Sequence, residues 1–195
     1  NGWTLPIPIV KTAAGWKVDI KATPAELQTR RLGRNELAAI QTVLAVADAQ
    51  EEFYAANPDG RAVKHFAQRA VSTPGKRDGL YWPSAANAPE SPLGPAFADV
   101  RPGQAYHGYR YHVLTEQGKD APGGARSYLR NGLMTEGYAL VAWPERYGDT
   151  GVMTFILSRD GTVYQKNLGP STDAAARRMK VYNPDASWQK VEPPK

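Results

Sequence analysis

The hydrophobic and polar positions of residues 35–56 alternate with the period of an α-helix. The apolar residues recur at spacings of three and four: Leu37, Ile40, Leu44 and Ala47. Asn35 can cap the first turn, and the sequence Asn-Pro-Asp-Gly at 57–60 breaks the pattern. Because the apolar stripe is broad and the opposite face is polar, we predict a long helix that packs on a core.

Residues 1–33 form the first of two predicted units. Two short strand-like runs, 5–10 and 16–20, predict a β-hairpin, whose first strand is an edge strand because it holds two prolines. The sequence Thr-Pro-Ala-Glu at 23–26 combines a cap, a proline at the first helical position and an acidic residue. We expect a short helix there that ends by Gly33. Because the chain begins without Met inside a strand-like run, we interpret this unit as the end of an upstream region.

The second predicted unit, residues 34–195, joins the long helix to a sheet. The pattern of 61–70 predicts a resumed helix, and a stretch rich in proline and glycine at 72–103 predicts a long loop that packs on the body. Alternation with a period of two then appears in four segments: 106–114, 138–143, 152–157 and 162–166. Asp160-Gly161 joins the last two segments as a tight turn. We therefore predict an α+β fold in which the long helix packs on a four-stranded antiparallel meander.

Composition narrows the classes of protein that remain. The chain has 42% hydrophobic and 22% charged residues, as folded domains do, and it contains no cysteine. The absence of thiols excludes a disulfide framework, a thiolate zinc site, an iron–sulfur cluster and a cysteine nucleophile. No run approaches the roughly 20 apolar residues of a membrane-spanning helix. The net charge of +5 is spread along the chain in short clusters, which argues against a nucleic-acid partner.

The usual catalytic and metal-binding residues form no recognisable group. His107 and His112 are five positions apart, so in a strand they point to opposite faces and cannot bind one ion together, and His65 falls on a helical pattern. No serine lies in a Gly-x-Ser-x-Gly elbow, and no spacing selects a pair of carboxylates for glycosidase chemistry. We therefore predict no catalytic residue, no metal site and no cofactor.

The proline-rich loop carries the first group of candidate ligand-binding residues. Lys76 and Arg77 supply positive charge, and Tyr81 and Trp82 supply aromatic rings, a mixture suited to an anionic or sugar-like ligand. The alternative is structural, because aromatic residues in a long loop commonly anchor it to the core, with Asp78 paired to a nearby arginine. For Trp82 the sequence favours the structural role, an anchor of the loop on the core, and it leaves a role in ligand binding open.

A second group of candidates lies in the predicted strand at 106–112. Alternation places His107, Tyr109 and Tyr111 on one face of this strand. One face should pack on the helix and the other could bind a ligand, and His107 and Tyr109 are the candidates for binding. Aromatic residues are also favoured in strands for structural reasons alone.

Four segments of the chain are similar to a known bacterial family. The segments 34–40, 72–83, 137–144 and 151–155 resemble the family called domain of unknown function 2950 (DUF2950), and the similarity spans most of the chain. The resemblance brings no assigned activity with it. It implies an exported protein that bears a signal peptide and an additional N-terminal region, and hence a location in the periplasm or outside the cell.

A second resemblance is to the globular part of type IV pilin-like and pseudopilin-like proteins. It rests on the last two of those segments together with three pairs: Asn35-Glu36, Gly108-Tyr109 and Asp160-Gly161. It implies a pilin-like body in which a helix packs on a sheet. A pilin carries a long apolar helical segment in front of this body, whereas this chain has a proline-bearing hairpin and a short charged helix, which argues against pilus-style polymerisation.

These observations lead to two hypotheses from different classes of protein. The first is an exported cell-envelope domain that acts by binding or assembly without catalysis, with a protein partner or with copies of itself. The second is a hydrolase whose site lies under the loop at 72–103. A pocket lined by convergent titratable groups would favour the enzyme, and a flat apolar surface would favour assembly.

Overall fold

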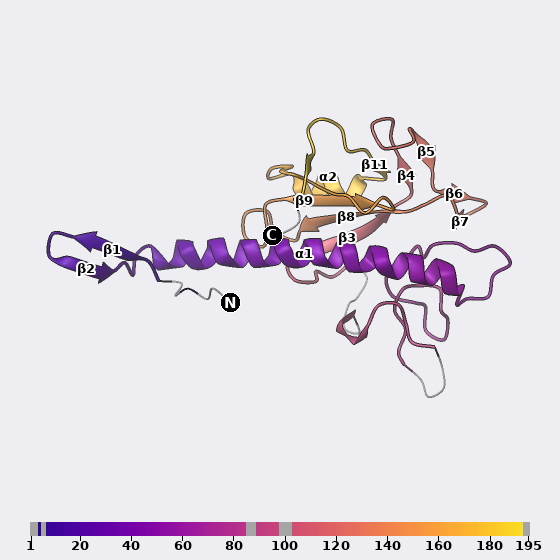
Figure 1. Cartoon of the computed structure of the whole chain (residues 1–195), viewed down its shortest axis with the longest axis horizontal. Helices are drawn as coiled ribbons and strands as arrows, with labels where there is room; N and C mark the ends of the chain where they lie inside the picture. The colour runs from indigo at the N-terminus through magenta and orange to yellow at the C-terminus, as the bar shows by residue number, and fades with distance from the viewer. Residues whose placement is uncertain (1–3, 5–6, 85–88, 98–102, 193–195) are drawn as a thin grey trace.

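A computed structural model describes residues 4, 7–84, 89–97 and 103–192 of the chain. One long helix, α1 (Thr23–Ala56), runs along the molecule, with a sheet on one side and the loops that follow the helix on the other (Figure 1). A β-hairpin at the N-terminal end of α1 extends beyond the sheet (Figure 1). Parts of the predicted first strand and of the predicted loop lie outside the described residues: 5–6, 85–88 and 98–102.

Helix α1 continues without a break through Gly33, so the prediction of two separate helices is wrong. A glycine inside a helix costs only about 1 kcal/mol relative to alanine, which the helix formers on both sides offset. Asn35 does not cap a helix, because its side-chain N–H donates to the backbone oxygen of Thr150 at 2.8 Å. The helix ends where Asn57 adopts the left-handed conformation, with a φ of 47°.

The main sheet has five antiparallel strands. In spatial order they are β12 (Gln189–Lys190), β10 (Val163–Lys166), β9 (Thr154–Ser158), β8 (Ala139–Pro144) and β3 (Tyr109–Leu114). Four further strands of two residues each lie between β3 and β8 along the chain. The predicted architecture, a helix packed on a four-stranded meander, is therefore wrong. A C-terminal strand pairs with β10 at the edge of the sheet, and most elements of the chain are short strands.

Three smaller sheets contain the remaining strands. They are β1 (Ile9–Thr12) with β2 (Gly15–Val18), β6 (Leu129–Arg130) with β7 (Leu133–Met134), and β11 (Val181–Tyr182) with β4 (Glu116–Gln117) and β5 (Arg126–Ser127). A 3-10 turn spans Pro95–Phe97. A short helix, α2 (Thr172–Arg178), contacts β8 on the side of the sheet away from α1 (Figure 1). Trp143 of β8 donates its indole N–H to Oδ1 of Asp173 at 2.9 Å, which fastens α2 to the sheet.

The core includes the contact of α1 with the middle strands β8 and β9. Every residue of these two strands is buried. The buried face of the helix includes the small side chains of Ala39, Val43 and Ala47. Tyr138, just before β8, donates its hydroxyl to the backbone oxygen of Ala47 at 3.1 Å, so this buried polar group is satisfied.

A group of hydrogen bonds fastens the N-terminal half of α1 to the loop between β8 and β9. Oε1 of Glu36 accepts the backbone N–H groups of Val152 at 2.9 Å and Met153 at 3.1 Å. Gln28 donates its Nε2–H to the backbone oxygen of Gly148 at 2.9 Å. Two of the segments that carry the family resemblance therefore meet in the fold. The chain N-terminal to this cluster projects away from the body (Figure 1).

The chain after α1 does not resume a helix at 61–70, contrary to the prediction. Gln50 of α1 holds this segment instead, since its Nε2–H donates to the backbone oxygen of Ala67 and its Oε1 accepts the Ala67 N–H, both at 2.8 Å. Phe66 also forms a β-bridge with Met134 of β7. Because Gln50 and Ala67 are both 0% exposed, these tertiary contacts outweigh the local helical pattern.

Candidate functional site

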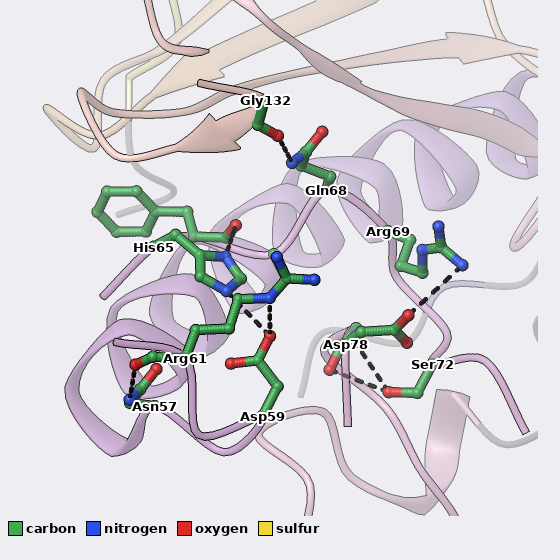
Figure 2. A network of polar contacts seen from close by, with 12 residues as sticks. Asn57, Asp59, Arg61, His65, Gln68, Arg69, Ser72, Asp78 and Gly132 are labelled. Atoms are coloured by element: carbon green, nitrogen blue, oxygen red, sulfur yellow. Dashed lines mark hydrogen bonds and ion pairs between the residues drawn. The ribbon is translucent and has the colours of Figure 1, made fainter. Parts of the chain in front are cut away.

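An open pocket lies at the C-terminal end of α1, where two turns of the following chain meet. Its volume is about 490 Å³, and it is lined by Pro58, Asp59 and Arg61 from the first turn and by residues 75–78 from the second. Figure 2 shows the polar contacts that hold the two turns: Asp59 bonds to Arg61 and His65, and Asp78 faces Arg69. Both turns therefore contribute charged side chains to the pocket.

In the first turn, Asp59 binds two nitrogen groups at one oxygen. Its Oδ2 lies 2.9 Å from Nε of Arg61 and 3.0 Å from Nε2 of His65, while Nδ1 of His65 lies 3.0 Å from the backbone oxygen of Phe66. Both ring nitrogens of His65 therefore face oxygen atoms of the protein. The ring is 6% exposed, so it supports the turn and presents no free nitrogen to a molecule in the pocket.

The first turn also carries two buried acceptors without a donor among the described residues. They are Oδ1 of Asn57 and Oδ1 of Asp59, although Nδ2–H of Asn57 donates to the backbone oxygen of Arg61 at 2.9 Å. A buried polar atom without a partner costs about 1–3 kcal/mol. The turn is therefore not optimised for stability alone, as is common where function constrains a sequence.

The second turn is closed by hydrogen bonds around Asp78. Its Oδ1 accepts the backbone N–H of Thr73 at 2.8 Å, and its Oδ2 accepts the Thr73 hydroxyl at 2.9 Å and lies 3.8 Å from Nη1 of Arg69. Partial burial opposes ionisation, yet the bonds from Thr73 and the charge of Arg69 hold the pKa of Asp78 below its usual value. At the base of the turn, Gly79 packs closely against the backbone of Ser72. A side chain would not fit there, because a Cβ on residue 79 would lie 2.7 Å from the backbone N of Ser72.

The predicted residues Lys76 and Arg77 stand on this turn. Lys76 is exposed and Arg77 is half-buried, and neither has an ion-pair partner among the residues that the structure describes. The guanidinium carbon of Arg77 lies 5.9 Å from the centroid of the Trp82 ring. Trp82 is 6% exposed and donates its indole N–H to the backbone oxygen of Pro89 at 3.1 Å. The buried Trp82 ring is therefore a fixed surface against which the Arg77 side chain packs. Tyr81 is half-buried and forms a β-bridge near the base of the turn.

The other two predicted residues, His107 and Tyr109, do not line this pocket. His107 is exposed with a φ of 50°, and Gly108 has a φ of 76°. Strand β3 therefore begins only at Tyr109, and His107 does not share a strand face with Tyr109 as predicted. Tyr109 is 0% exposed, and its hydroxyl donates to the backbone oxygen of Met153 at 2.9 Å. Burial, reinforced by Glu36, raises the pKa of Tyr109. Tyr109 is therefore a core residue.

The sequence does not point to Asp59, Arg61 and His65 as members of a site. Asn-Pro-Asp-Gly at 57–60 signals only the end of a helix, and the helical pattern predicted at 61–70 separates the two charged residues from the later loop. The one available signal is a pair of opposite charges two residues apart inside a turn. Surface turns carry such pairs for structural reasons too, so this signal selects no site by itself.

A second pocket, of about 340 Å³, lies beside β4, β5 and β9. Two of its polar side chains are already bonded: Nε2–H groups of Gln117 donate to the backbone oxygens of Pro122 at 2.8 Å and Gly124 at 2.6 Å, and Tyr128 donates its hydroxyl to Gln117 at 3.0 Å. Burial raises the pKa of Tyr128 to about 12, so its hydroxyl stays protonated at neutral pH. Because Gln117 and Tyr128 are occupied in this way, we assign no site there.

The fold and the first pocket define a mixed α+β domain with an open, charged pocket at the end of its long helix. Within the part of the chain that the structure describes, no group of three or more His, Asp or Glu side chains could hold a metal ion. The same described part contains no helix with both the length and the apolar character for crossing a membrane.

Comparison with known proteins identifies the family. Residues 1–191 match the family model described as "Protein of unknown function (DUF2950)", and the chain belongs to this family, as the sequence motifs predict. No curated protein and no solved structure matches the chain. The resemblance to pilin-like proteins therefore gains no support from the comparisons.

Proposed function

We propose that this protein is an exported cell-envelope domain that binds an anionic ligand, without transforming it, in the pocket beside Lys76 and Arg77. One observation carries the proposal. The two cations reach the pocket without ion-pair partners among the described residues, whereas Asp78 and Oδ2 of Asp59 are already held by donors and Oδ1 of Asp59 is buried. The pocket therefore has free positive charge and little free negative charge.

The structure supports a modest affinity. Solvent screens the charges of Lys76 and Arg77, so each simple ion pair contributes about 0–1 kcal/mol, and a hydrogen bond to a charged group about 1.5–3 kcal/mol. Because the Arg77 side chain already lies against Trp82, it loses less conformational freedom when a ligand binds. Two or three such contacts correspond to a dissociation constant on the order of 1 mM.

The hydrolase remains the second candidate, because two carboxylates, Asp59 and Asp78, line the same pocket. Against it, the pKa of Asp78 is lowered by its contacts with Thr73 and Arg69, so Asp78 is a poor general acid near neutral pH. His65 offers no free ring nitrogen as a base. Turnover of an ester, phosphate or glycoside by the wild type that is lost in Asp78→Asn would favour the hydrolase and overturn binding without catalysis.

Calorimetric titration at low salt tests the binding site, with inorganic phosphate and with glucuronate as the two probes. We expect at least one probe to bind and the affinity to fall as salt is added. The double variant Lys76→Ala/Arg77→Ala should bind at least about tenfold more weakly, since it loses about 1.4 kcal/mol or more of charged contacts. The matched control Lys119→Ala/Lys190→Ala removes two exposed lysines elsewhere and should bind as the wild type does.

Two outcomes would overturn the assignment of the ligand to this pocket. One is equal affinity of the two double variants, which would mean that the anions bind through diffuse surface charge. The other is the lack of any measurable heat or shift in melting temperature with either probe at millimolar concentration. Both variants should keep the melting temperature of the wild type within a few degrees, because the three lysines are exposed and the half-buried Arg77 has no ion-pair partner among the described residues.

Export is a separate part of the proposal, and it rests on the family resemblance. The chain has no cysteine and is therefore compatible with an oxidising compartment, although a cysteine-free chain is equally compatible with a reducing one. Fractionation of the native cells, followed by detection of the protein with an antibody, tests the location. Recovery in the cytosolic fraction alone would contradict export.

A further inference from the structure

Large hydrophobic side chains are exposed mainly toward the N-terminal end of the molecule. In the β1–β2 hairpin and the residues that join it to α1, the exposed fractions are 56% for Ile9, 70% for Trp16, 48% for Val18 and 77% for Ile20. Outside the hairpin and α1, such exposure occurs among the described residues only at Val63 and Val181. The most exposed apolar side chains therefore lie on the hairpin that projects beyond the sheet and on its connection to α1 (Figure 1).

The strand register places three apolar side chains and one lysine on the same face of the hairpin. Ile9 pairs with Val18, and Lys11 pairs with Trp16, and residues directly opposite each other in antiparallel strands share a face. Nζ of Lys11 lies 6.0 Å from the centroid of the Trp16 ring. A lone two-stranded hairpin is at best marginally stable in water, so this exposed face is suited to a hairpin that another surface covers.

The same end of the chain carries the excess positive charge. Residues 1–34 contain six Lys and Arg against two Asp and Glu, whereas residues 35–195 contain eighteen against seventeen. Lys11, Lys17 and Lys21 lie in or beside the hairpin, and none has an ion-pair partner among the residues that the structure describes. A complementary partner therefore offers negative charge next to apolar surface.

We propose that the hairpin binds the surface of a bilayer that contains anionic lipids. Ile9, Trp16 and Val18 enter the interfacial region, and the lysines reach the phosphate groups above it. The lipid interface supplies both features that the hairpin needs, negative headgroups outside and hydrocarbon beneath them. Trp is favoured there because its ring is apolar and its N–H is polar, and a lysine can bury its methylene stem while its ammonium group stays in water.

Two other partners fit these observations less well. A second copy of the chain would bring two positively charged hairpins together, and the exposed large apolar side chains of the nearly neutral body, among its described residues, are spread over three separate segments: Leu37 and Leu44 of α1, Val63, and Val181 of β11. A nucleic acid would satisfy the lysines but would leave Ile9 and Val18 exposed to water. This inference does not depend on the pocket, which lies near the other end of α1.

Flotation of the full chain with lipid vesicles tests the inference. We expect binding to vesicles of phosphatidylcholine mixed with phosphatidylglycerol, and much weaker binding to phosphatidylcholine alone. A lysine near an anionic surface contributes about 1 kcal/mol, or about fivefold in partitioning. The double variant Lys11→Ala/Lys17→Ala should therefore partition about thirtyfold more weakly. Trp16→Ser should also weaken binding, whereas Val63→Ser, which removes an exposed apolar side chain from the body, should not.

Fluorescence gives a readout that is specific to the hairpin face. Vesicles with phosphatidylglycerol should shift the tryptophan emission of the wild type to shorter wavelength, and Trp16→Phe should lose most of this shift while still binding. Far-UV circular dichroism should show that all variants keep the wild-type fold, because the altered side chains are exposed.

Three results would overturn the lipid assignment. One is equal binding to both kinds of vesicle, and the second is equal binding of the Lys11→Ala/Lys17→Ala variant and the control Lys119→Ala/Lys190→Ala. The third is a dimer in sedimentation velocity experiments that Trp16→Ser abolishes, which would assign the hairpin to self-association. Failure of vesicle binding would leave the titrations of the pocket unaffected, so the two proposals are tested separately.

Discussion

Replacing Gln50 by leucine should destabilise the protein, because a single buried side chain holds the chain that follows α1. Gln50 forms two hydrogen bonds of 2.8 Å with the backbone of Ala67, one as donor and one as acceptor. Both residues are 0% exposed. Leucine has a similar size, so Gln50→Leu removes the hydrogen bonds without opening a large cavity and leaves a buried N–H and a buried C=O without partners.

The expected loss follows from the two orphaned backbone groups. Each buried donor or acceptor that loses its partner costs about 1–3 kcal/mol, and the apolar leucine regains about 1 kcal/mol because it needs no partner of its own. We therefore expect the free energy of unfolding to fall by about 1–5 kcal/mol. This is a large share of the about 5–15 kcal/mol that stabilises a typical domain.

Urea unfolding followed by far-UV circular dichroism measures this loss as a shift of the midpoint at constant slope. The matched control is Gln41→Leu, at an exposed position of the same helix, which should change stability by less than about 0.5 kcal/mol. Limited proteolysis should cut Gln50→Leu faster within 66–82, since this segment loses its attachment to α1. If Gln50→Leu stays within about 1 kcal/mol of the control, the two hydrogen bonds do not hold the segment as argued.

Three further predictions concern the loop, the glycines and one histidine. Truncation of Trp82 to Ala should cost about 3–5 kcal/mol, and an unchanged melting temperature would show that Trp82 is no anchor. Gly151→Ala should cost more than about 1 kcal/mol, because its Cβ would lie 2.2 Å from the hydroxyl of the buried Tyr109. By contrast, Gly33→Ala should stabilise the protein by up to about 1 kcal/mol, since nothing lies within 4 Å of a Cβ at this position. In thermal unfolding, the melting temperature should therefore fall for Gly151→Ala and rise for Gly33→Ala. Burial lowers the pKa of His112 below 6.5, against the hydrogen bond to Met179 that favours protonation. The unfolded chain therefore binds the proton more tightly, and stability falls as the pH drops below about 6.5. Urea midpoints at pH 7 and pH 5 should differ more for the wild type than for His112→Gln, and equal differences would contradict this.

Local patterns predict those elements of the fold that are long enough to show a period. The strands β3, β8, β9 and β10 lie mostly within the four segments with a period of two. The two-residue strands and β12 are too short to show any period, so the five-stranded order could not be predicted. Helix α1 continues through Gly33, across the predicted boundary between the two units. Its continuity depends on the helix formers on both sides of Gly33 and on the hydrogen bonds of Glu36 to the loop between β8 and β9.

In the candidate site, too, the sequence predicts the residues with a local pattern and misses those whose role depends on the fold. Lys76 and Arg77 could be predicted, because two adjacent cations in a loop with aromatic residues are visible in the sequence. The role of Asp59 could not be predicted, since it depends on the left-handed turn after α1 and on His65, which lies beside the segment that Gln50 holds through Ala67. The assignment of His107 and Tyr109 to one strand face fails because the strand begins three residues later than the aromatic pattern indicates.

The length of α1 has a consequence for how the two ends of the molecule can communicate. A helix of 34 residues spans about 50 Å at about 1.5 Å per residue. Glu36 and Gln28 hold its N-terminal half to the loop between β8 and β9. Helix α1 is therefore a spacer that keeps the hairpin and the pocket at opposite ends of the molecule.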